Sequence, residues 1–338
     1  MKKKKKLIIA LITAILLFFI IELVIVEAGY LHLGFAKRVD YTNVVTPEEY
    51  GLTTQEIDLI TSDNMRIHAY EVLLPNPDGI VIMLTGITGP SVTHFYGEAA
   101  LVAQENFTSI LIDTRGHGKS DGNRVAFAID DVKDVQAVVD YINSKPEYED
   151  LPIVIMGLSM GGATAINSAS LIDDIDALIT LSAFSSWTDV CVDVIEQKGW
   201  PRIAGDIMRP GIILHGFLSH GMDYFNIVPE KTIKQIGNKP ILFIHNQYDT
   251  QVPIANHFRL MEAYDGNNVR VWIKDSWEHF IVNDNKIEDP LSDPEYCEKI
   301  LDFIREVRDS RTSFFVHGIK KFYPFIIKYV RVNANRFD

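Results

Sequence analysis

Residues 152–162 read PIVIMGLSMGG. The first five, PIVIM, form a continuous apolar run that begins with a proline, as expected of a strand buried on both faces of a sheet. Residues 161–170 follow a helical pattern. Between strand and helix, residues 157–161 have the form G-x-S-x-G, whose small residues let the chain turn sharply. The turn is predicted to leave the Ser159 hydroxyl projecting from the carboxyl edge of the sheet.

Strands and helices alternate on both sides of this turn. Residues 56–60 and 67–74 alternate apolar and polar side chains around a turn at Asp63-Asn64, which predicts an antiparallel hairpin. Farther along, buried strands alternate with helices, and that order predicts a doubly wound, mostly parallel α/β sheet with helices on both faces. The other expected strands are 79–84, 108–113, 177–181, 240–245 and 269–273, and the other expected helices are 94–105, 130–143 and 295–308.

A serine at its ordinary pKa is a weak nucleophile and needs a base that an acid orients. In a sheet with this kind of turn, the chain order is serine, acid, histidine. His279 lies on a polar loop after the strand 269–273 and is the expected base for Ser159. Asp249, in the stretch HNQYDTQVP, is the expected acid, and Asp275 competes although it shares the short loop of His279. The other histidines beyond residue 240 are His245 at a strand end, His257 in a helical stretch and His317 near the C-terminus.

Two backbone N–H groups are expected to stabilise an oxyanion beside the serine. One belongs to Met160, at the start of the helix. The other is expected from the loop LTGITGP at 84–90, where Gly86 permits close backbone approach and Ile87 supplies the N–H. A plain glycine-rich turn is the alternative interpretation of this loop.

Four segments, taken in order, resemble an α/β-hydrolase: TGITG, DTRGHGKS at 113–120, GLSMGG, and HNQYDTQVP with His279. The resemblance is to the capped serine esterases, lipases and serine aminopeptidase-like enzymes, and it covers about residues 56–308. It implies a helical cap inserted at about 185–238 and a structural role for DTRGHGKS beside the site. Such enzymes usually have His-Gly where this chain has Thr85-Gly86, which changes a side chain but leaves the backbone donor.

The cap is rich in aromatic and methionine side chains, which suit adaptable apolar pockets. They predict a lid over an acyl chain or another apolar group. Packing of the cap onto the core is the alternative, because most buried aromatic residues are simply core. The residues are Trp187, Trp200, Met208, Phe217, Met222, Tyr224 and Phe225.

No cofactor, nucleotide or metal site is expected. A P-loop would need glycine where Asp113 stands, and a dinucleotide loop would need one at Asp121. A haloalkane dehalogenase would carry aspartate at the position of Ser159. Two cysteines, Cys191 and Cys297, are too few for a disulfide framework or a multi-cysteine metal site, and we expect free thiols.

Composition supports a folded domain. The 338 residues are 47% apolar and 23% charged, which allows a full core and excludes both wholesale disorder and a multi-span membrane protein. A net charge of -13 makes nucleic acid a poor partner. The expected hydrolase domain, 56–310, stands between two basic ends.

The N-terminal end predicts a membrane anchor. Lys2 to Lys6 precede the apolar run 7–26, and at ~1.5 Å per helical residue this run matches a hydrocarbon core of ~30 Å. The lysines predict a cytoplasmic N-terminus and an extracytoplasmic hydrolase domain. The anchor is expected over 1–28 and a connector over 29–55. A secreted protein cleaved near Ala28 is the alternative, although the apolar run exceeds that of ordinary signal sequences.

The C-terminal segment, 311–338, mixes aromatic and basic residues. This composition suits a membrane interface, with an extra element packed on the hydrolase surface as the alternative. The sequence as a whole predicts a membrane-anchored serine hydrolase that cleaves an ester, with a small-molecule lipid or acyl ester as its substrate class. A peptidase or acyltransferase using the same residues, and a catalytically silent binding module, are the alternatives.

Overall fold

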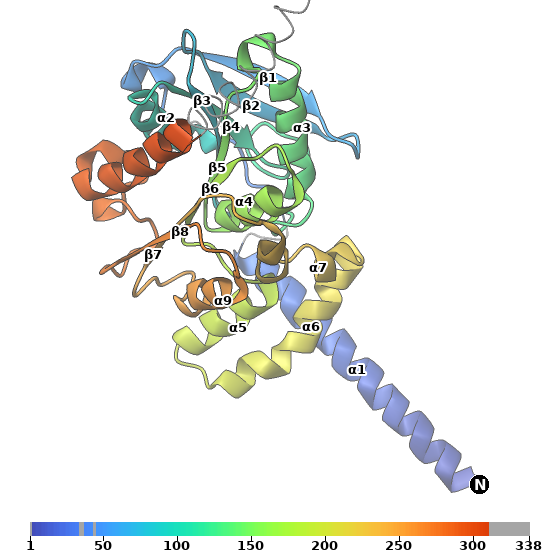
Figure 1. Cartoon of the computed structure of the whole chain (residues 1–338). Coiled ribbons are helices and arrows are strands. Elements are labelled where there is room, and N and C mark those ends of the chain that lie inside the picture. The colour runs from blue at the N-terminus through green and yellow to red at the C-terminus, as the bar shows by residue number, and fades with distance from the viewer. Residues whose placement is uncertain (1, 34–36, 43–44, 311–338) are drawn as a thin grey trace, which may run out of the picture.

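The computed structural model describes residues 2–33, 37–42 and 45–310. Within them lies one eight-stranded sheet with the order β1-β2-β4-β3-β5-β6-β7-β8 (Figure 1). β2 pairs antiparallel with β1 and β4, and all other neighbours are parallel. The mostly parallel α/β sheet and the antiparallel hairpin at its start are therefore confirmed. The strands are β1 (Thr54–Ile60), β2 (Arg66–Val72), β3 (Gly79–Leu84), β4 (Phe107–Asp113), β5 (Ile153–Leu158), β6 (Ala177–Leu181), β7 (Ile241–Asn246) and β8 (Val269–Lys274).

Helices cover both faces of the sheet, because the central strands carry apolar side chains on both faces. On β3, Ile82 packs in the core under α3 and α4, whereas Met83 packs in the core under α2 and the helix 294–310. The other helices are α1 (Lys2–Leu33), α2 (Tyr96–Ala103), α3 (Asp131–Asn143), α4 (Met160–Leu171), α5 (Trp187–Gln197), α6 (Arg202–His220), α7 (Asp223–Asn226), α8 (Pro229–Thr232) and α9 (Ala255–Ala263). Short 3-10 turns are η1 (Pro47–Tyr50), η2 (Val92–Phe95), η3 (Pro146–Tyr148), η4 (Ile233–Gln235), η5 (Asn283–Asn285) and η6 (Pro290–Ser292).

The sequence pattern located the buried strands to within two residues, and its bounds for β3 and β6 coincide with the structure. The helix expected over 94–105 differs. Ser91 Oγ accepts a hydrogen bond from the Thr93 N–H at 3.2 Å, and this cap starts the turn η2 before α2 begins. The strand expected to reach residue 74 ends at Val72.

The register of the parallel strands brings their carboxyl ends to one edge. Leu84 of β3 is paired with Gly157 of β5, and Leu158 is paired with Leu181 of β6. Leu181 is in turn paired with Ile244 of β7. The loops that leave these four strands therefore open side by side, and they contain the expected serine, oxyanion loop and acid.

The helices α5 to α8 and the turn η4 are inserted between β6 and β7, over the residues expected for the cap. The aromatic residues of the cap fall into two groups. Trp187 and Tyr224 are buried, whereas Trp200, Phe217 and Met222 are exposed. Packing on the core therefore accounts for only part of the aromatic content of the cap.

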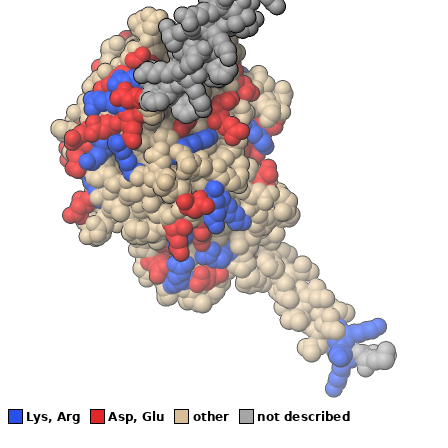
Figure 2. All heavy atoms as spheres, in the orientation of Figure 1, with Lys and Arg blue, Asp and Glu red and all other residues tan. Residues whose placement is uncertain are grey.

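The N-terminal helix α1 projects from the globule and is long and apolar enough to cross a membrane by length and composition (Figure 1). In the view of Figure 2, no charged side chain interrupts its surface between the globule and the terminal lysines. The helix continues to Leu33, so the expected boundary at residue 28 lies inside it. Glu22, Val26 and Tyr30 follow one another at a four-residue spacing and are buried, which shows that this end of α1 packs on the domain. The C-terminal segment 311–338, with His317, lies outside the described residues.

Candidate active site

Ser159 stands at the turn from β5 into α4 with φ 55° and ψ −115°, a conformation that a non-glycine residue adopts only when its surroundings hold it. Its N–H donates to the Leu181 carbonyl of β6 at 2.7 Å. The flanking glycines make the turn possible. A Cβ on Gly161 would lie 2.4 Å from the Leu84 carbonyl oxygen, and one on Gly157 would lie 2.2 Å from the Gly161 carbonyl oxygen. The serine side chain consequently stands at the carboxyl edge of the sheet.

Asp249 and His279 lie in hydrogen-bond contact. His279 Nδ1 is 2.8 Å from Asp249 Oδ2 and 3.0 Å from Oδ1. The N–H groups of Gln251 and Val252 also donate to Asp249 Oδ1, each at 2.8 Å. Burial by itself would raise the pKa of Asp249, but the hydrogen bond and charge of His279 outweigh it and hold the pKa below its ordinary value. An ionised Asp249 fixes the proton of His279 on Nδ1 and leaves Nε2 free to accept one.

His279 is held above the sheet edge by its backbone. Asn246, the last residue of β7, donates through Nδ2 to the carbonyls of Glu278 at 2.8 Å and Phe280 at 3.1 Å. Ser182, directly after β6, donates through Oγ to the His279 carbonyl at 3.1 Å. The sequence analysis missed both residues. Their only sequence signal is a small polar side chain at the end of a buried strand.

Ser159 and His279 are brought to the same edge of the sheet, but among the described residues no hydrogen bond joins their side chains. Catalytic hydrogen bonds are often long in a free enzyme and shorten when substrate binds.

The loop after β3 lies against the serine. A Cβ built on Gly86 would stand 3.5 Å from Ser159 Cβ and 4.0 Å from its Oγ, which places the loop within van der Waals reach of the serine side chain. Ile87 follows, and its carbonyl accepts a hydrogen bond from His117 Nε2 at 3.0 Å. Burial lowers the pKa of His117, which favours a neutral ring that donates from Nε2. The Thr85 side chain turns away toward His94 Nε2, at 2.9 Å.

The rejected candidates have other surroundings. His245 is buried in β7, where its Nε2 donates to the Val252 carbonyl at 2.9 Å, and burial lowers its pKa. His257 is buried in α9, where burial and the nearby His245 lower its pKa to about 4. Asp275 is exposed on the loop before His279. In the described part of the chain, no group of three or more His, Cys, Asp or Glu side chains is arranged to hold a metal ion.

The protein family described as serine aminopeptidase, S33, matches residues 75–209 of this chain. WAV2 of Arabidopsis thaliana, an α/β-hydrolase domain-containing protein, is 26% identical over 227 residues, which cover 65% of this chain and 69% of WAV2. The esterase Pf2001 of Pyrococcus furiosus superimposes with a TM-score of 0.60 at 21% identity, over 80% of this chain and 98% of the esterase. The chain has the α/β-hydrolase fold. An uncharacterized membrane protein of Saccharomyces cerevisiae, YNL320W, is 24% identical over 267 residues, which cover 78% of this chain and 84% of that protein.

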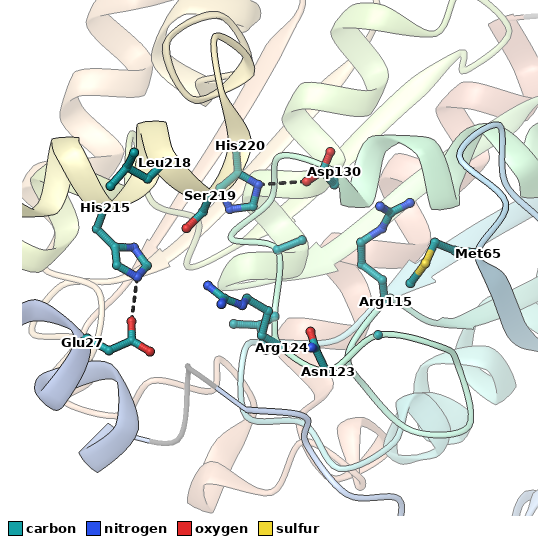
Figure 3. A pocket seen from close by; sticks show the side chains of 13 residues that line it. Glu27, Met65, Arg115, Asn123, Arg124, Asp130, His215, Leu218, Ser219 and His220 are labelled. Carbon is teal, nitrogen blue, oxygen red and sulfur yellow. Dashed lines mark hydrogen bonds and ion pairs between the residues drawn. The ribbon is translucent and has the colours of Figure 1, made fainter. Parts of the chain in front are cut away.

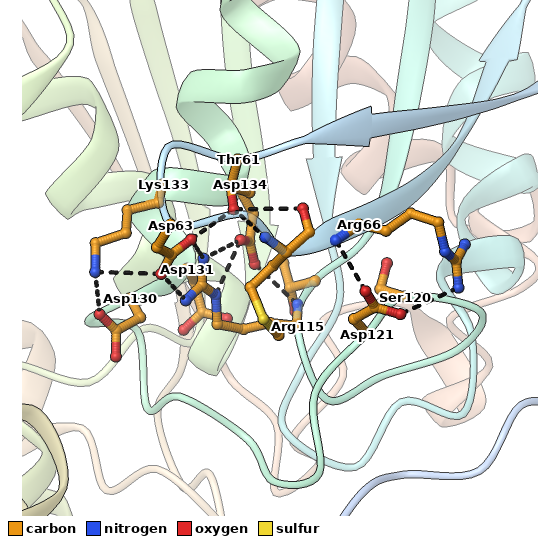
Figure 4. A network of polar contacts seen from close by, with 12 residues as sticks. Thr61, Asp63, Arg66, Arg115, Ser120, Asp121, Asp130, Asp131, Lys133 and Asp134 are labelled. Carbon is orange, nitrogen blue, oxygen red and sulfur yellow. Dashed lines mark hydrogen bonds and ion pairs between the residues drawn. The ribbon is translucent and has the colours of Figure 1, made fainter.

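The segment DTRGHGKS at 113–120 is held in place by an ionic network (Figure 4). The Arg115 guanidinium contacts Asp134 at 2.7 Å and Asp63 at 2.8 Å, and the Arg115 N–H also donates to Asp134. Lys133 adds a contact to Asp130 at 2.7 Å. The network ties β1–β2 to α3 and fixes the segment whose His117 holds the loop at Ile87. Its arrangement is that of a structural support beside the site.

An apolar cluster extends from the site into the cap. Met160 and Ile87, the two expected oxyanion donors, pack in the same cluster as Trp187 of α5 and as Val26 and Tyr30 of α1. A small cavity of about 40 Å³ lies within it. The side chains around the two expected oxyanion donors are therefore apolar, and the N-terminal helix contributes to them.

A larger polar pocket of about 600 Å³ opens between the end of α1, the end of α6 and the loop 122–126 (Figure 3). His215 Nε2 lies 2.8 Å from Glu27, and His220 Nδ1 lies 2.8 Å from Asp130. None of the three triad candidates lines this pocket. Its polar contacts join α1 and α6 to the domain.

Proposed function

We propose that this hydrolase is a membrane-anchored serine esterase that cleaves carboxylic esters with an apolar acyl group. The observation that carries the proposal is the strained Ser159 at the same sheet edge as the hydrogen-bonded pair Asp249 and His279. A serine held in a strained backbone conformation near an oriented histidine is the arrangement that nucleophilic catalysis requires.

In the proposed reaction, His279 Nε2 removes the proton of Ser159 Oγ as the oxygen attacks the ester carbonyl carbon. The carbonyl oxygen takes the developing negative charge, which the N–H groups of Ile87 and Met160 stabilise. The carbon–oxygen bond to the alcohol then breaks, and His279 returns the proton to the leaving alcohol. Water, deprotonated by His279, attacks the acyl-enzyme in the second half, and the acid is released with Ser159 restored.

The apolar cluster around Met160, Ile87 and Trp187 supports an acyl group as the part of the substrate that the enzyme covers. The structural likeness to an esterase and the family match to a serine aminopeptidase both fit this triad, since peptide and ester hydrolysis use the same residues. We favour the ester because the cluster beside the serine supplies apolar side chains that suit an acyl group. An acyltransferase would differ only in using an alcohol in place of water.

The anchor is the second part of the proposal. The apolar, exposed surface of α1 up to Ile21 supports insertion into a membrane, and Lys2 to Lys6 support a cytoplasmic N-terminus. Cleavage near Ala28 would cut the helix between Val26 and Tyr30, which both pack in the apolar cluster beside the site. This packing favours an uncleaved anchor, with the hydrolase domain on the extracytoplasmic side.

The test is labelling of the full chain in detergent with a fluorophosphonate probe, which reacts with activated serines. We expect wild type to be labelled, Ser159→Ala to lose all labelling, and Asp249→Asn to be slowed by about 10³- to 10⁴-fold because the histidine takes the wrong tautomer. Ser170→Ala is the matched control, since Ser170 lies on the same helix and donates to the Ile166 carbonyl away from the site. A folded wild type that resists the probe and hydrolyses no ester would refute the enzyme and favour the binding module.

A further inference from the structure

The cap helix α6 carries an apolar stripe that no part of the described chain covers. Ile203, Ile207, Phe217 and Leu218 are 63%, 52%, 40% and 66% exposed. At 100° per residue these positions fall within one narrow face of the helix, while Ile212 and Gly216, on another face, are buried against the cap. Trp200, just before the helix, and Met222, just after it, continue the exposed apolar surface.

The same helix crosses α1. A Cβ on Gly211 would lie 2.6 Å from Glu22 Cβ, so the two backbones approach as closely as small residues allow between membrane helices. Beside the crossing, Phe19 of α1 and Pro210, Leu214 and Phe217 of α6 line an apolar groove of about 540 Å³. Asp206 and Arg209 also line it, and their side chains are paired with each other at 3.8 Å.

The position of this crossing along α1 fixes its depth. If Lys6 stays among the lipid headgroups and Leu7 begins the hydrocarbon region, Phe19 lies ~18 Å along the helix axis and Glu22 ~22 Å, within a hydrocarbon core of ~30 Å. A tilted helix advances less across the bilayer per residue, which places Phe19 farther still from the extracytoplasmic boundary. The groove therefore stands at the level of the acyl chains.

We propose that α6 lies in the extracytoplasmic leaflet of the membrane that α1 spans, with lipid acyl chains covering its apolar stripe and filling the groove beside Phe19. The inference rests on the proposed anchor. The occupant is lipid because the stripe continues the lipid-facing surface of α1. The exposed Trp200 at the start of α6 suits the interfacial level, where tryptophan is favoured. The cap would thus lie at the surface of the bilayer that supplies an apolar ester.

The experiment measures depth in vesicles of phosphatidylcholine whose acyl chains carry bromine, which quenches nearby fluorophores. In a full chain with Cys191→Ala and Cys297→Ala, an environment-sensitive fluorophore is attached to a single cysteine at Leu16→Cys, Ile207→Cys or Asn267→Cys. Leu16 reports on α1 and Ile207 on the stripe. Asn267 is exposed on the loop that precedes β8 and reports on the domain. We expect a loss of fluorescence in brominated lipid at Leu16 and Ile207, and none at Asn267.

A second measurement leaves both cysteines in place. Tryptophan quenching of the native chain, minus that of Trp200→Phe, gives the signal of Trp200, and we expect it to be quenched in the same vesicles. If Leu16 is quenched but neither Ile207 nor Trp200 is, the inference about α6 is overturned and the proposed anchor stands. No quenching at Leu16 would overturn the proposed anchor and, with it, the placement of α6.

Discussion

Asn246 sets the position of His279 without touching its ring. Its side chain donates to the carbonyls on both sides of the histidine, and it is fully buried at the end of β7. We expect Asn246→Ala to lower kcat by about 10- to 100-fold with little change in KM, because the carbonyls of Glu278 and Phe280 lose their donor and the loop shifts. Ester hydrolysis at saturating and limiting substrate separates the two constants.

Asn268→Ala is the matched control. Asn268 donates through the same side-chain amide to the Asn238 carbonyl at 3.2 Å, but on an exposed loop away from the site. This variant is expected to keep the wild-type kcat. If both variants lose kcat equally, the loss in Asn246→Ala comes from general destabilisation. Positioning of His279 would then be the wrong explanation.

The candidate triad was predictable from the sequence, but its supports were not. Ser159, Asp249 and His279 follow from a short motif and from strand order, which are local features. The supports join distant positions: Ser182 and His279 are 97 residues apart, Asn246 and Glu278 are 32 apart, and His117 and Ile87 are 30 apart. A side chain that donates to a backbone carbonyl places no demand on the identity of its partner, so no sequence pattern marks these contacts.

At the scale of elements, the turn between β5 and α4 depends on the strand beside it. A methyl group on Gly161 would meet the carbonyl oxygens of Leu84 and Thr85, at 2.4 and 2.5 Å, and backbone atoms cannot yield as a side chain does. We expect Gly161→Ala to destabilise the fold by about 1–3 kcal/mol and to displace the oxyanion loop, which begins at Thr85. Thermal unfolding and the rate of fluorophosphonate labelling measure the two effects.

Gly29→Ala provides the contrast. A Cβ at Gly29 meets no atom within 4 Å, and alanine is favoured over glycine in a helix by about 0.5–1 kcal/mol. This variant is expected to label at the wild-type rate and to unfold at the same temperature or slightly higher. Equal behaviour of the two alanine variants would contradict a steric role for Gly161.

Elements were predictable where one local property decides them. Strands β3 and β6 are wholly buried and are bounded by polar or glycine residues, so their apolar runs give their ends directly. The predicted start of α2 was wrong because the cap at Ser91 depends on the path of the preceding loop. The length of α1 was underestimated because its last turns are stabilised by packing against α6 and the cap, which hydropathy along the sequence does not record.

At the scale of the whole molecule, α1 is the proposed anchor and also packs on the domain. Its exposed portion meets solvent or lipid, whereas Val26 and Tyr30 pack against the cap, and Trp187 Nε1 donates to the Tyr30 hydroxyl at 2.7 Å. Glu27 contacts His215 of α6. The end of α1 therefore links the proposed anchor to the cap and to the apolar cluster at the candidate site.

Because the end of α1 packs on the domain, removing that end should destabilise the domain, whereas removing only the exposed part of α1 should not. A chain shortened to residues 22–338 keeps the packed face of α1, and we expect it to unfold at the wild-type temperature and to hydrolyse a soluble ester at the wild-type rate. A chain shortened to residues 34–338 loses the burial of Val26 and Tyr30, each about 1.5–3 kcal/mol, and is expected to unfold several degrees lower. Scanning fluorimetry in one detergent compares them. Equal unfolding temperatures would mean that the helix end adds nothing to the domain, and cleavage near Ala28 would then carry no cost in stability.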